Sequence, residues 1–341
     1  MRQFRLALLS ASLIALLTGC KTAPLPAAAC AGKIIFASPE GASYNVFSVE
    51  PNGSDLQRLT DSNALNGTPA ISHQQDRIAF SAHNDGENAL YVMEIDGTAK
   101  TKVLESEHPL TFPLWSPTAQ DELIFLHRGG SNLRELRKIS LNTPDSAKTI
   151  EIDFPDFFLA EDLSHSPTGE SVAFGSITMM RGGSHVYVID LKSRKMTNLT
   201  GLSIANVLKV VSRTNALKSS NHPLRAASDP NWSPDGSRLV FVGTQQEPIT
   251  EGGMSEIYTM NRNGRDRKIV EVNLYGQKSQ PVWSPDGTQI AFINDRNAIY
   301  KVNVDGSNLI KIIDIDDGAQ FQALGLYEPD LAWQAVPCHS H

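Results

Sequence analysis

The chain of 341 residues has few cysteines and, after its first residues, no long apolar run. Its three cysteines stand at positions 20, 30 and 338, so no two have the close spacing of a zinc site. No stretch after residue 19 approaches the roughly 20 apolar residues of a transmembrane helix. The sequence motifs of zinc proteases, of serine hydrolases with a nucleophile elbow and of P-loop nucleotide-binding proteins are also missing. We therefore expect no cofactor, and the sequence contains no direct signal of catalysis.

A phrase of about ten residues recurs along the chain. Its two clearest copies, at 229–241 and 280–292, share Pro-x-Trp-Ser-Pro-Asp-Gly followed by a short apolar run that ends in phenylalanine. Weaker copies cover 68–80, 112–125 and 166–174, and Lys33–Phe36 is a half-copy. The closing phenylalanines are separated by 44, 45, 49, 67 and 51 residues. A period of roughly 40–50 residues of short strands and turns is typical of propeller blades.

Several repeats share three signals at a regular distance. Pro-Asp-Gly favours a tight turn, because proline fixes φ and glycine accepts a positive φ. A third strand follows, as at Leu90–Ile95, Val186–Ile189, Ile257–Met260 and Ile299–Val304, and most of these end in an Asn-Gly or Asp-Gly hairpin. The fourth strand commonly ends in Leu-Thr. An antiparallel sandwich is the alternative, but the shared spacing of all these signals favours an all-β, six-bladed propeller of four-stranded antiparallel blades.

These repeats resemble the propeller repeats of the TolB family of the Tol–Pal envelope system, and also those of prolyl-oligopeptidase relatives. The resemblance covers residues 32–336, and Trp-Ser-Pro-Asp-Gly is its most specific part. It implies a non-catalytic scaffold that binds envelope proteins, with peptidoglycan-associated lipoprotein as a candidate partner. TolB proteins carry an α/β domain before the propeller. Only a short linker precedes the first strand here, so contacts made through that domain are not carried over.

The C-terminal segment is expected to complete the first blade. Nothing before Lys33 resembles an opening strand, whereas Glu328–Trp333 resembles one and has no strand after it. Pairing of this segment with residues 33–36 would close the ring and remove its exposed edges. Residues 337–341 are then a short tail.

Cys30 and Cys338 flank the two ends of that expected pairing. A disulfide between them would replace the missing Pro-Asp-Gly turn of blade one. It would close a loop of roughly 300 residues, for which chain entropy gives up to about 5 kcal/mol. Two free thiols in the tails are the alternative.

Residues 1–19 have the form of a secretory signal. Arg2 and Arg5 precede an apolar core, and Leu17-Thr-Gly-Cys20 resembles the lipobox of bacterial lipoproteins. The alternative is an ordinary signal peptide with a chance cysteine. Cys20 is the expected site of lipidation, and residues 20–31 the lipidated cysteine and its linker. Lys21 in place of aspartate implies, by the same resemblance, the outer membrane, with the protein facing the periplasm.

The expected mature chain is acidic. Residues 1–19 contain two arginines and no acidic residue, so 28 basic residues remain against 37 acidic ones, a net charge of −9. This charge argues against nucleic acid or anionic lipid headgroups as the main partner. The membrane contact expected here is the N-terminal lipid, and the expected state is a monomer.

Insertions in blades four and five are the candidate docking surface for a partner. The two blades are joined by about residues 201–228, a segment that contains four basic residues and no acidic residue up to Ser228. Residues 177–184 lengthen a loop on the same side of the ring. Long loops on a rigid scaffold commonly carry binding sites, although a neutral insertion is an equal alternative. The candidate residues are Lys209, Arg213, Lys218, Arg225, Met179, Met180 and Arg181.

Histidines support a second functional hypothesis from another class. His83, His127, His185 and His222 are expected on the side of the insertions, where they could hold a divalent metal, as in propeller pectate-degrading lyases. A metal-dependent polysaccharide lyase or hydrolase with its site in the channel is therefore the alternative function. Their spacing is not diagnostic, and scattered surface histidines are commoner. His165 occupies the tryptophan position of its repeat, and Trp115, Trp232 and Trp283 are expected to pack between blades.

Overall fold

The computed structural model is all-β. It describes residues 29–84, 86–129, 134–150, 158–178, 183–201, 224–245, 255–315 and 331–337. The strands form one eight-stranded sheet and four four-stranded sheets. A single parallel pairing, Tyr44 with Leu65, joins the two halves of the eight-stranded sheet, which are themselves four-stranded and antiparallel. None of the described residues forms a helix that could cross a bilayer.

We name the four-stranded antiparallel groups units one to six, in chain order. Unit one consists of β24 (Leu331–Pro337), β1 (Ala29–Glu40), β2 (Ser43–Val49) and β3 (Gln57–Arg58). Unit two consists of β4 (Leu65–Ile71), β5 (Arg77–Asn84), β6 (Glu87–Glu94) and β7 (Thr101–Ser106). Unit three consists of β8 (Leu110–Trp115), β9 (Glu122–Arg128), β10 (Arg134–Ser140) and β11 (Thr143–Ile150).

The remaining three units repeat this order. Unit four consists of β12 (Phe158–His165), β13 (Ser171–Thr178), β14 (Gly183–Asp190) and β15 (Met196–Asn198). Unit five consists of β16 (Leu224–Trp232), β17 (Arg238–Gln245), β18 (Ser255–Asn261) and β19 (Lys268–Ile269). Unit six consists of β20 (Lys278–Trp283), β21 (Gln289–Asn294), β22 (Ala298–Asn303) and β23 (Ile310–Asp314).

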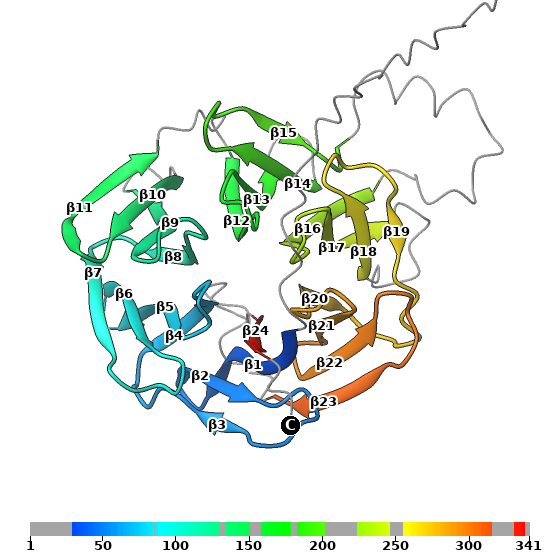
Figure 1. Cartoon of the computed structure of the whole chain (residues 1–341), viewed down its shortest axis with the longest axis horizontal. Helices are drawn as coiled ribbons and strands as arrows, with labels where there is room; N and C mark the ends of the chain where they lie inside the picture. Colours follow the sequence, from blue (N-terminus) through cyan, green and yellow to red (C-terminus); the bar gives the residue numbers. More distant parts are fainter. Residues whose placement is uncertain are drawn as a thin grey trace, which may run out of the picture.

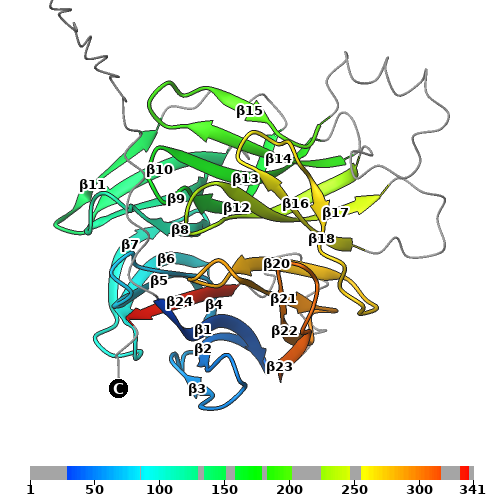
Figure 2. The ribbon, with the colours of Figure 1, turned by 45° about the vertical axis from the view of Figure 1, so that its right-hand side comes forward.

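The units lie around a common centre, with the first strand of each unit innermost (Figure 1). A view turned by 45° shows the same strands as sheets that stand side by side (Figure 2). The first-to-second turns and the third-to-fourth hairpins lie on one side of the arrangement, because successive antiparallel strands reverse direction. We call this the turn side, and the opposite side, which carries the second-to-third loops, the insertion side.

Pairing of the C-terminal segment with the first strand is present as expected. β24 pairs with β1 in antiparallel register, with Trp333 opposite Ile34 and Leu331 opposite Phe36. The paired region is longer than the sequence indicated, because β1 already begins at Ala29 and β24 extends to Pro337. Cys30 is opposite Val336, whereas Cys338 lies outside the described residues, so the disulfide stays a prediction.

The repeat phenylalanines form the centre of each unit. The phenylalanines of units two to six, on the second strands, are almost fully buried. In four of these five units the phenylalanine stacks on a tyrosine of the third strand, with ring centroids 5.5 to 5.8 Å apart. Such aromatic cross-strand pairs stabilise a sheet beyond the area that they bury. The stacked pairs are Phe80–Tyr91, Phe174–Tyr187, Phe241–Tyr258 and Phe292–Tyr300.

Hydrophobic clusters join every unit to the next. Each cluster combines the second and third strands of one unit with the first and second strands of its neighbour, as where Leu90 packs with Trp115 and Leu123. Trp232 and Trp283 have the same role between units four and five and units five and six, so the packing role predicted for the tryptophans is confirmed. Units six and one share such a cluster as well, in which Trp333 packs with Val282.

The Leu-Thr motif at the end of the fourth strand has a specific structural role. The threonine hydroxyl accepts a hydrogen bond from a third-strand N–H, Val46 to Thr60 in unit one and Val186 to Thr200 in unit four, both at 2.9 Å. The preceding leucine donates its N–H to the carbonyl of the same valine. The motif thus extends the pairing of a very short outer strand, which leaves little free strand edge.

Candidate functional site

The innermost strands surround a cavity of about 740 Å³. It is lined by the first strands of units two to six, by β24 and by the turns that follow the first strands. None of its described lining residues is lysine or arginine. Prolines of the repeat motif form much of the wall at the turn side, so this part of the cavity is rigid and mostly apolar.

One residue in each of five inner strands has a left-handed backbone. Their φ angles are between 49° and 53°, and each stands where the register between the first and second strands shifts. Such a bulge bends the strand and redirects a side chain, and bulges are frequent beside binding sites. A non-glycine residue with this backbone costs free energy, which the surrounding structure must offset. These five residues, which we call the bulge ring, are Thr68, Phe112, Asp162, Asp229 and Gln280.

Hydrogen bonds connect the bulge ring from one unit to the next. The Gln280 N–H donates to Oδ2 of Asp229 at 2.9 Å, and its side-chain amide donates to Oδ1 of Asp162 at 3.2 Å. On another part of the ring, the Phe112 N–H donates to the Thr68 hydroxyl at 3.3 Å. The carboxylates and the amide therefore form one acidic sector, held in place by three units.

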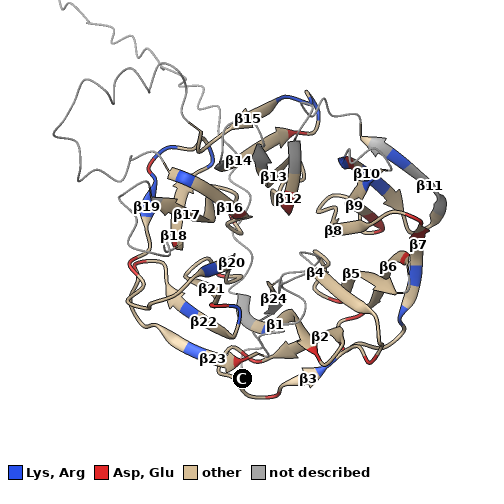
Figure 3. Cartoon of the chain, turned by 180° about the vertical axis from the view of Figure 1, so that it is seen from behind, with Lys and Arg blue, Asp and Glu red and all other residues tan. Residues whose placement is uncertain are grey.

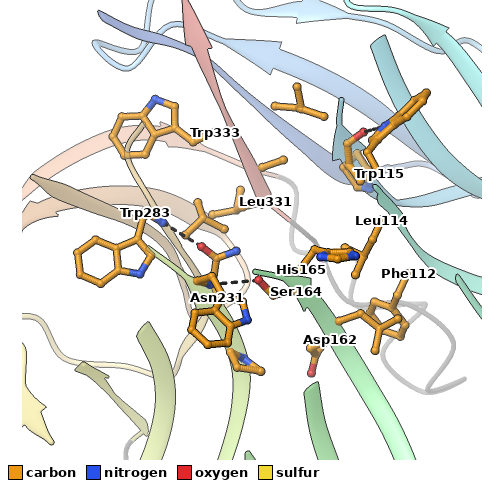
Figure 4. A pocket seen from close by; sticks show the side chains of 18 of the residues that line it. Phe112, Leu114, Trp115, Asp162, Ser164, His165, Asn231, Trp283, Leu331 and Trp333 are labelled. Carbon is orange, nitrogen blue, oxygen red and sulfur yellow. Dashed lines mark hydrogen bonds between the residues drawn. The ribbon is translucent and has the colours of Figure 1, made fainter. Parts of the chain in front are cut away.

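A second layer of contacts supports this sector. The backbone N–H of Trp232 donates to the Ser164 hydroxyl at 3.1 Å, and the backbone N–H of Trp283 donates to the side-chain oxygen of Asn231 at 3.3 Å (Figure 4). In both cases a side chain of one unit satisfies the backbone of the next. The cavity wall is therefore fixed by neighbouring units, and a ligand would meet a preformed surface.

His165 stands beside this cavity in place of the repeat tryptophan. Its Nδ1 lies 3.2 Å from the carbonyl oxygen of Ser166. Burial lowers its pKa below the usual value, and the contact with that carbonyl opposes the shift only in part. His165 lines the cavity at this position, and a packing role in place of the tryptophan stays a prediction.

The three candidate metal-binding histidines that the structure describes lie in three different units. His83 contacts Asn88, and His127 lies 3.3 Å from the Ser106 hydroxyl and 3.6 Å from a Glu135 oxygen. His185 lies on β14 of unit four, and burial lowers its pKa. Burial, with the nearby Arg137 cation, also lowers the pKa of His127, against the opposing effect of Glu135. Within the described ranges no group of three metal-ligating side chains is present, and His222 lies outside them.

Of the candidate docking residues, only Arg225 is described. It is exposed on β16, at the end of the strand that follows the insertion. The others, Lys209, Arg213, Lys218, Met179, Met180 and Arg181, lie outside the described residues.

The bulge ring was not identified from the sequence. A usable signal existed, because four of its five members directly precede the first proline of the repeat. The residue before proline is restricted to few conformations, and this position recurs in every repeat. Its chemistry changes from repeat to repeat while the proline stays in four of the five, which is the pattern of a variable side chain on a fixed scaffold.

Comparison with known proteins agrees with the fold. No family model matches the chain. The Tol-Pal system protein TolB of Francisella tularensis subsp. tularensis is 24% identical over 255 residues, which cover 74% of this chain and 51% of that protein. The chain thus spans about half the length of the curated TolB relatives that it matches.

Two solved structures show how widely the fold is shared. TolB from Acinetobacter baumannii superposes with a TM-score of 0.63 at 15% identity, over 89% of this chain and 66% of that one. An oligogalacturonate lyase from Vibrio parahaemolyticus superposes with a TM-score of 0.50 at 11% identity, over 81% of this chain and 73% of that one. The chain is a TolB-like β-propeller.

Proposed function

We propose that the chain is a six-bladed propeller that acts as a non-catalytic binding scaffold at the bacterial envelope. The six units are its blades, and β24 closes the ring by completing blade one. Ring closure is supported by the hydrophobic cluster between units six and one, which resembles the clusters between the other neighbouring units. A lipid on Cys20 would hold the ring at the outer membrane, facing the periplasm.

The proposed binding site is the cavity at the centre. Its bulge ring presents two carboxylates and an amide that neighbouring units hold in position. Fixed acceptors in a partly apolar cavity suit a protein segment that brings N–H donors or a cationic side chain. The TolB relatives belong by name to the Tol-Pal system, so an envelope protein of that system, such as peptidoglycan-associated lipoprotein, is the candidate partner.

Affinity capture from native membranes tests this function. We expect the double variant Asp162→Asn with Asp229→Asn to lose a partner that the native chain recovers. Asp96→Asn with Asp305→Asn is the matched control, because it changes the charge equally at two exposed hairpins. Unchanged recovery with the cavity variant would contradict binding in the cavity.

The insertion between units four and five is a second proposed contact for the same partner. Replacing Lys209, Arg213, Lys218 and Arg225 by glutamate would reverse its charge. Reduced recovery would support docking at the insertion, and unchanged recovery would leave only the cavity.

The alternative is a metal-dependent lyase or hydrolase acting on polysaccharide. One lyase shares the fold, but that likeness concerns architecture alone. Metal analysis of the purified protein separates the two functions, because a stoichiometric transition metal would favour the enzyme.

A further inference from the structure

Positive charge is concentrated on the turn-side hairpins of two neighbouring units. The β14–β15 hairpin of unit four carries Lys192 and Lys195, and the β18–β19 hairpin of unit five carries Arg262 and Arg265, with Lys268 at the start of β19. We call these five residues the basic rim. Blue segments mark it beside β15 and β19 in Figure 3. The hairpin of unit five packs against Leu199, at the end of β15 that lies away from the β14–β15 hairpin, since a Cβ on Gly264 would stand 2.8 Å from the Leu199 carbonyl oxygen.

The cations of the basic rim are exposed, and Lys192 interacts electrostatically with Asp190 at a longer distance than that of an ion pair. No carboxylate in the described part of the chain lies within 4.0 Å of any of the five. The hairpin acids are hydrogen-bonded to neutral groups instead. Asp190 accepts from the Ser193 hydroxyl and N–H, and Asp266 accepts from the Asn261 amide.

Some other cations of this protein form ion pairs with carboxylates. Lys138 pairs with Glu122 at 2.9 Å, and Lys311 pairs with Asp314 at 2.6 Å. The equivalent hairpins of units one and six carry acidic residues, Asp55 and Asp305, and no lysine or arginine within the turn itself. The equivalent hairpin of unit two carries one cation, Lys100, so cations are most numerous on the hairpins of units four and five, in a chain whose net charge is negative.

The chain enters the propeller on the same side as the basic rim. Ala29 of β1 pairs with Pro337 of β24, at the position that is the first-to-second turn in the other units. The 28 residues before Ala29, which include Cys20, therefore join the ring from the turn side. A lipid on that segment would bring the turn side toward the membrane.

We propose that the basic rim docks on anionic phospholipid headgroups. The orientation of the propeller in this proposal rests on the proposed lipid anchor. A lipid on a short Ala- and Pro-containing linker limits the distance from the bilayer but not the tilt of the ring. Clustered lysine and arginine side chains are attracted to an anionic surface within about a Debye length, roughly 8–10 Å. The lipid and the basic rim together would leave the insertion side facing away from the membrane, open to a partner.

This docking modifies the expectation drawn from net charge. The net charge of the chain opposes anionic lipids as the main partner. The acidic hairpins of units one and six would still be repelled by an anionic surface. A rim confined to two units permits a tilted contact, in which the turn side of units four and five approaches the surface and the acidic units stay farther from it than one Debye length.

Vesicle flotation tests the proposal without the lipid. A chain starting at Lys21 retains every described strand, so it keeps the whole described structure. We expect it to bind vesicles of phosphatidylcholine with phosphatidylglycerol, not vesicles of phosphatidylcholine alone, and to dissociate as salt rises. Each cation near an anionic surface contributes about 1 kcal/mol, or roughly fivefold. Arg262→Glu with Arg265→Glu should therefore lower partitioning by about 30-fold or more.

The matched control is Arg128→Glu with Lys148→Glu in unit three. It reverses two exposed cations outside the basic rim and changes the net charge equally. Retained binding by the control supports a specific rim. An equal loss in both variants, or no binding of the native chain to phosphatidylglycerol, would overturn the proposal. These outcomes are independent of lipidation, which the mass of the mature N-terminal peptide reports separately.

Discussion

At the scale of single residues, this propeller places non-glycine residues in left-handed backbone at two recurrent positions. One is the bulge ring around the cavity, and the other follows the hairpin glycine between the third and fourth strands. At the hairpin position the φ angles are 52° for Asp55, 52° for Ala99, 52° for Asp266 and 55° for Asn308. Aspartate and asparagine tolerate this conformation better than other residues with a Cβ. Ala99 is therefore the unfavourable member of the group.

Ala99→Asn should stabilise the protein. Ala99 is exposed and its φ is positive, so asparagine removes part of a backbone strain without disturbing packing. We expect the free energy of unfolding to rise by about 0.5–1 kcal/mol in urea denaturation. Asn308→Ala in unit six is the reverse substitution at the equivalent exposed position and should lower it by a similar amount. A change of the same sign in both variants would refute this reasoning.

Histidine burial predicts that acid destabilises the fold. Burial lowers the pKa values of His127, His165 and His185 below the ordinary value of 6.5. The unfolded chain therefore binds protons at a higher pH than the folded chain does. The contribution of these histidines to the free energy of unfolding is fully present above their pKa in the unfolded chain. It is lost as the pH falls below about 6.5. Urea denaturation at pH values of about 7.5 and 5.5 should show this decrease.

A substitution assigns part of this decrease to one histidine. His165→Gln removes a titrating group beside the cavity, so the difference in unfolding free energy between the two pH values should become smaller. His73→Gln, at an exposed position of the same cavity wall, is the control. If His165→Gln kept the full difference in unfolding free energy between the two pH values, His165 would not contribute to the loss of stability in acid.

At the scale of strands, the sequence predicted most elements because several signals coincide. In the two clearest repeats, Pro-Asp-Gly, the apolar run with phenylalanine and the Asn-Gly or Asp-Gly hairpin together bound three strands. The early start of β1 at Ala29 was missed, because residues 29–32 contain small residues without a strand pattern. Their pairing depends on β24, which lies about 300 residues away in the chain. Long-range pairing of this kind leaves no local signal.

The cavity was harder to predict than the strands. Each bulge depends on the register between two strands, and the side chains of the bulge ring interact across units, as Gln280 does with Asp162. A single repeat does not contain this information. Four of the positions are recognisable by their place before proline, but the hydrogen bonds that unite them exist only in the folded chain.

β24 should be essential for a stable fold. Its removal would expose the edge of β1 and the cluster that Leu331 and Trp333 complete with unit six. A chain ending at Asp330 should lose at least about 3–5 kcal/mol, the usual cost of deleting one large buried side chain, and should aggregate through the free edge. Thermal unfolding and soluble yield measure both effects. A chain ending at Pro337 is the control and should keep the native unfolding midpoint under reducing conditions.

At the scale of the whole molecule, the contact between units six and one decides how the protein unfolds. The clusters of the other five neighbouring pairs connect units that follow each other in the chain, whereas this contact joins the two ends of the described structure. A closed ring would unfold as one cooperative system, because no unit has a free face. An opened ring would expose two apolar faces at once.

Gly53 provides a precise test of this contact. It has a φ of 84° in the hairpin of unit one, and a Cβ there would collide with the carbonyl oxygen of Ile312 in unit six. Gly53→Ala should therefore combine a left-handed backbone penalty of about 1–2 kcal/mol with displacement of unit six. Gly41→Ala, in the same unit, has a φ of 62° and no neighbour within 4 Å, so it should show the backbone penalty alone. If urea denaturation gave equal losses for the two variants, units one and six would not be in contact in solution, and the ring would be open.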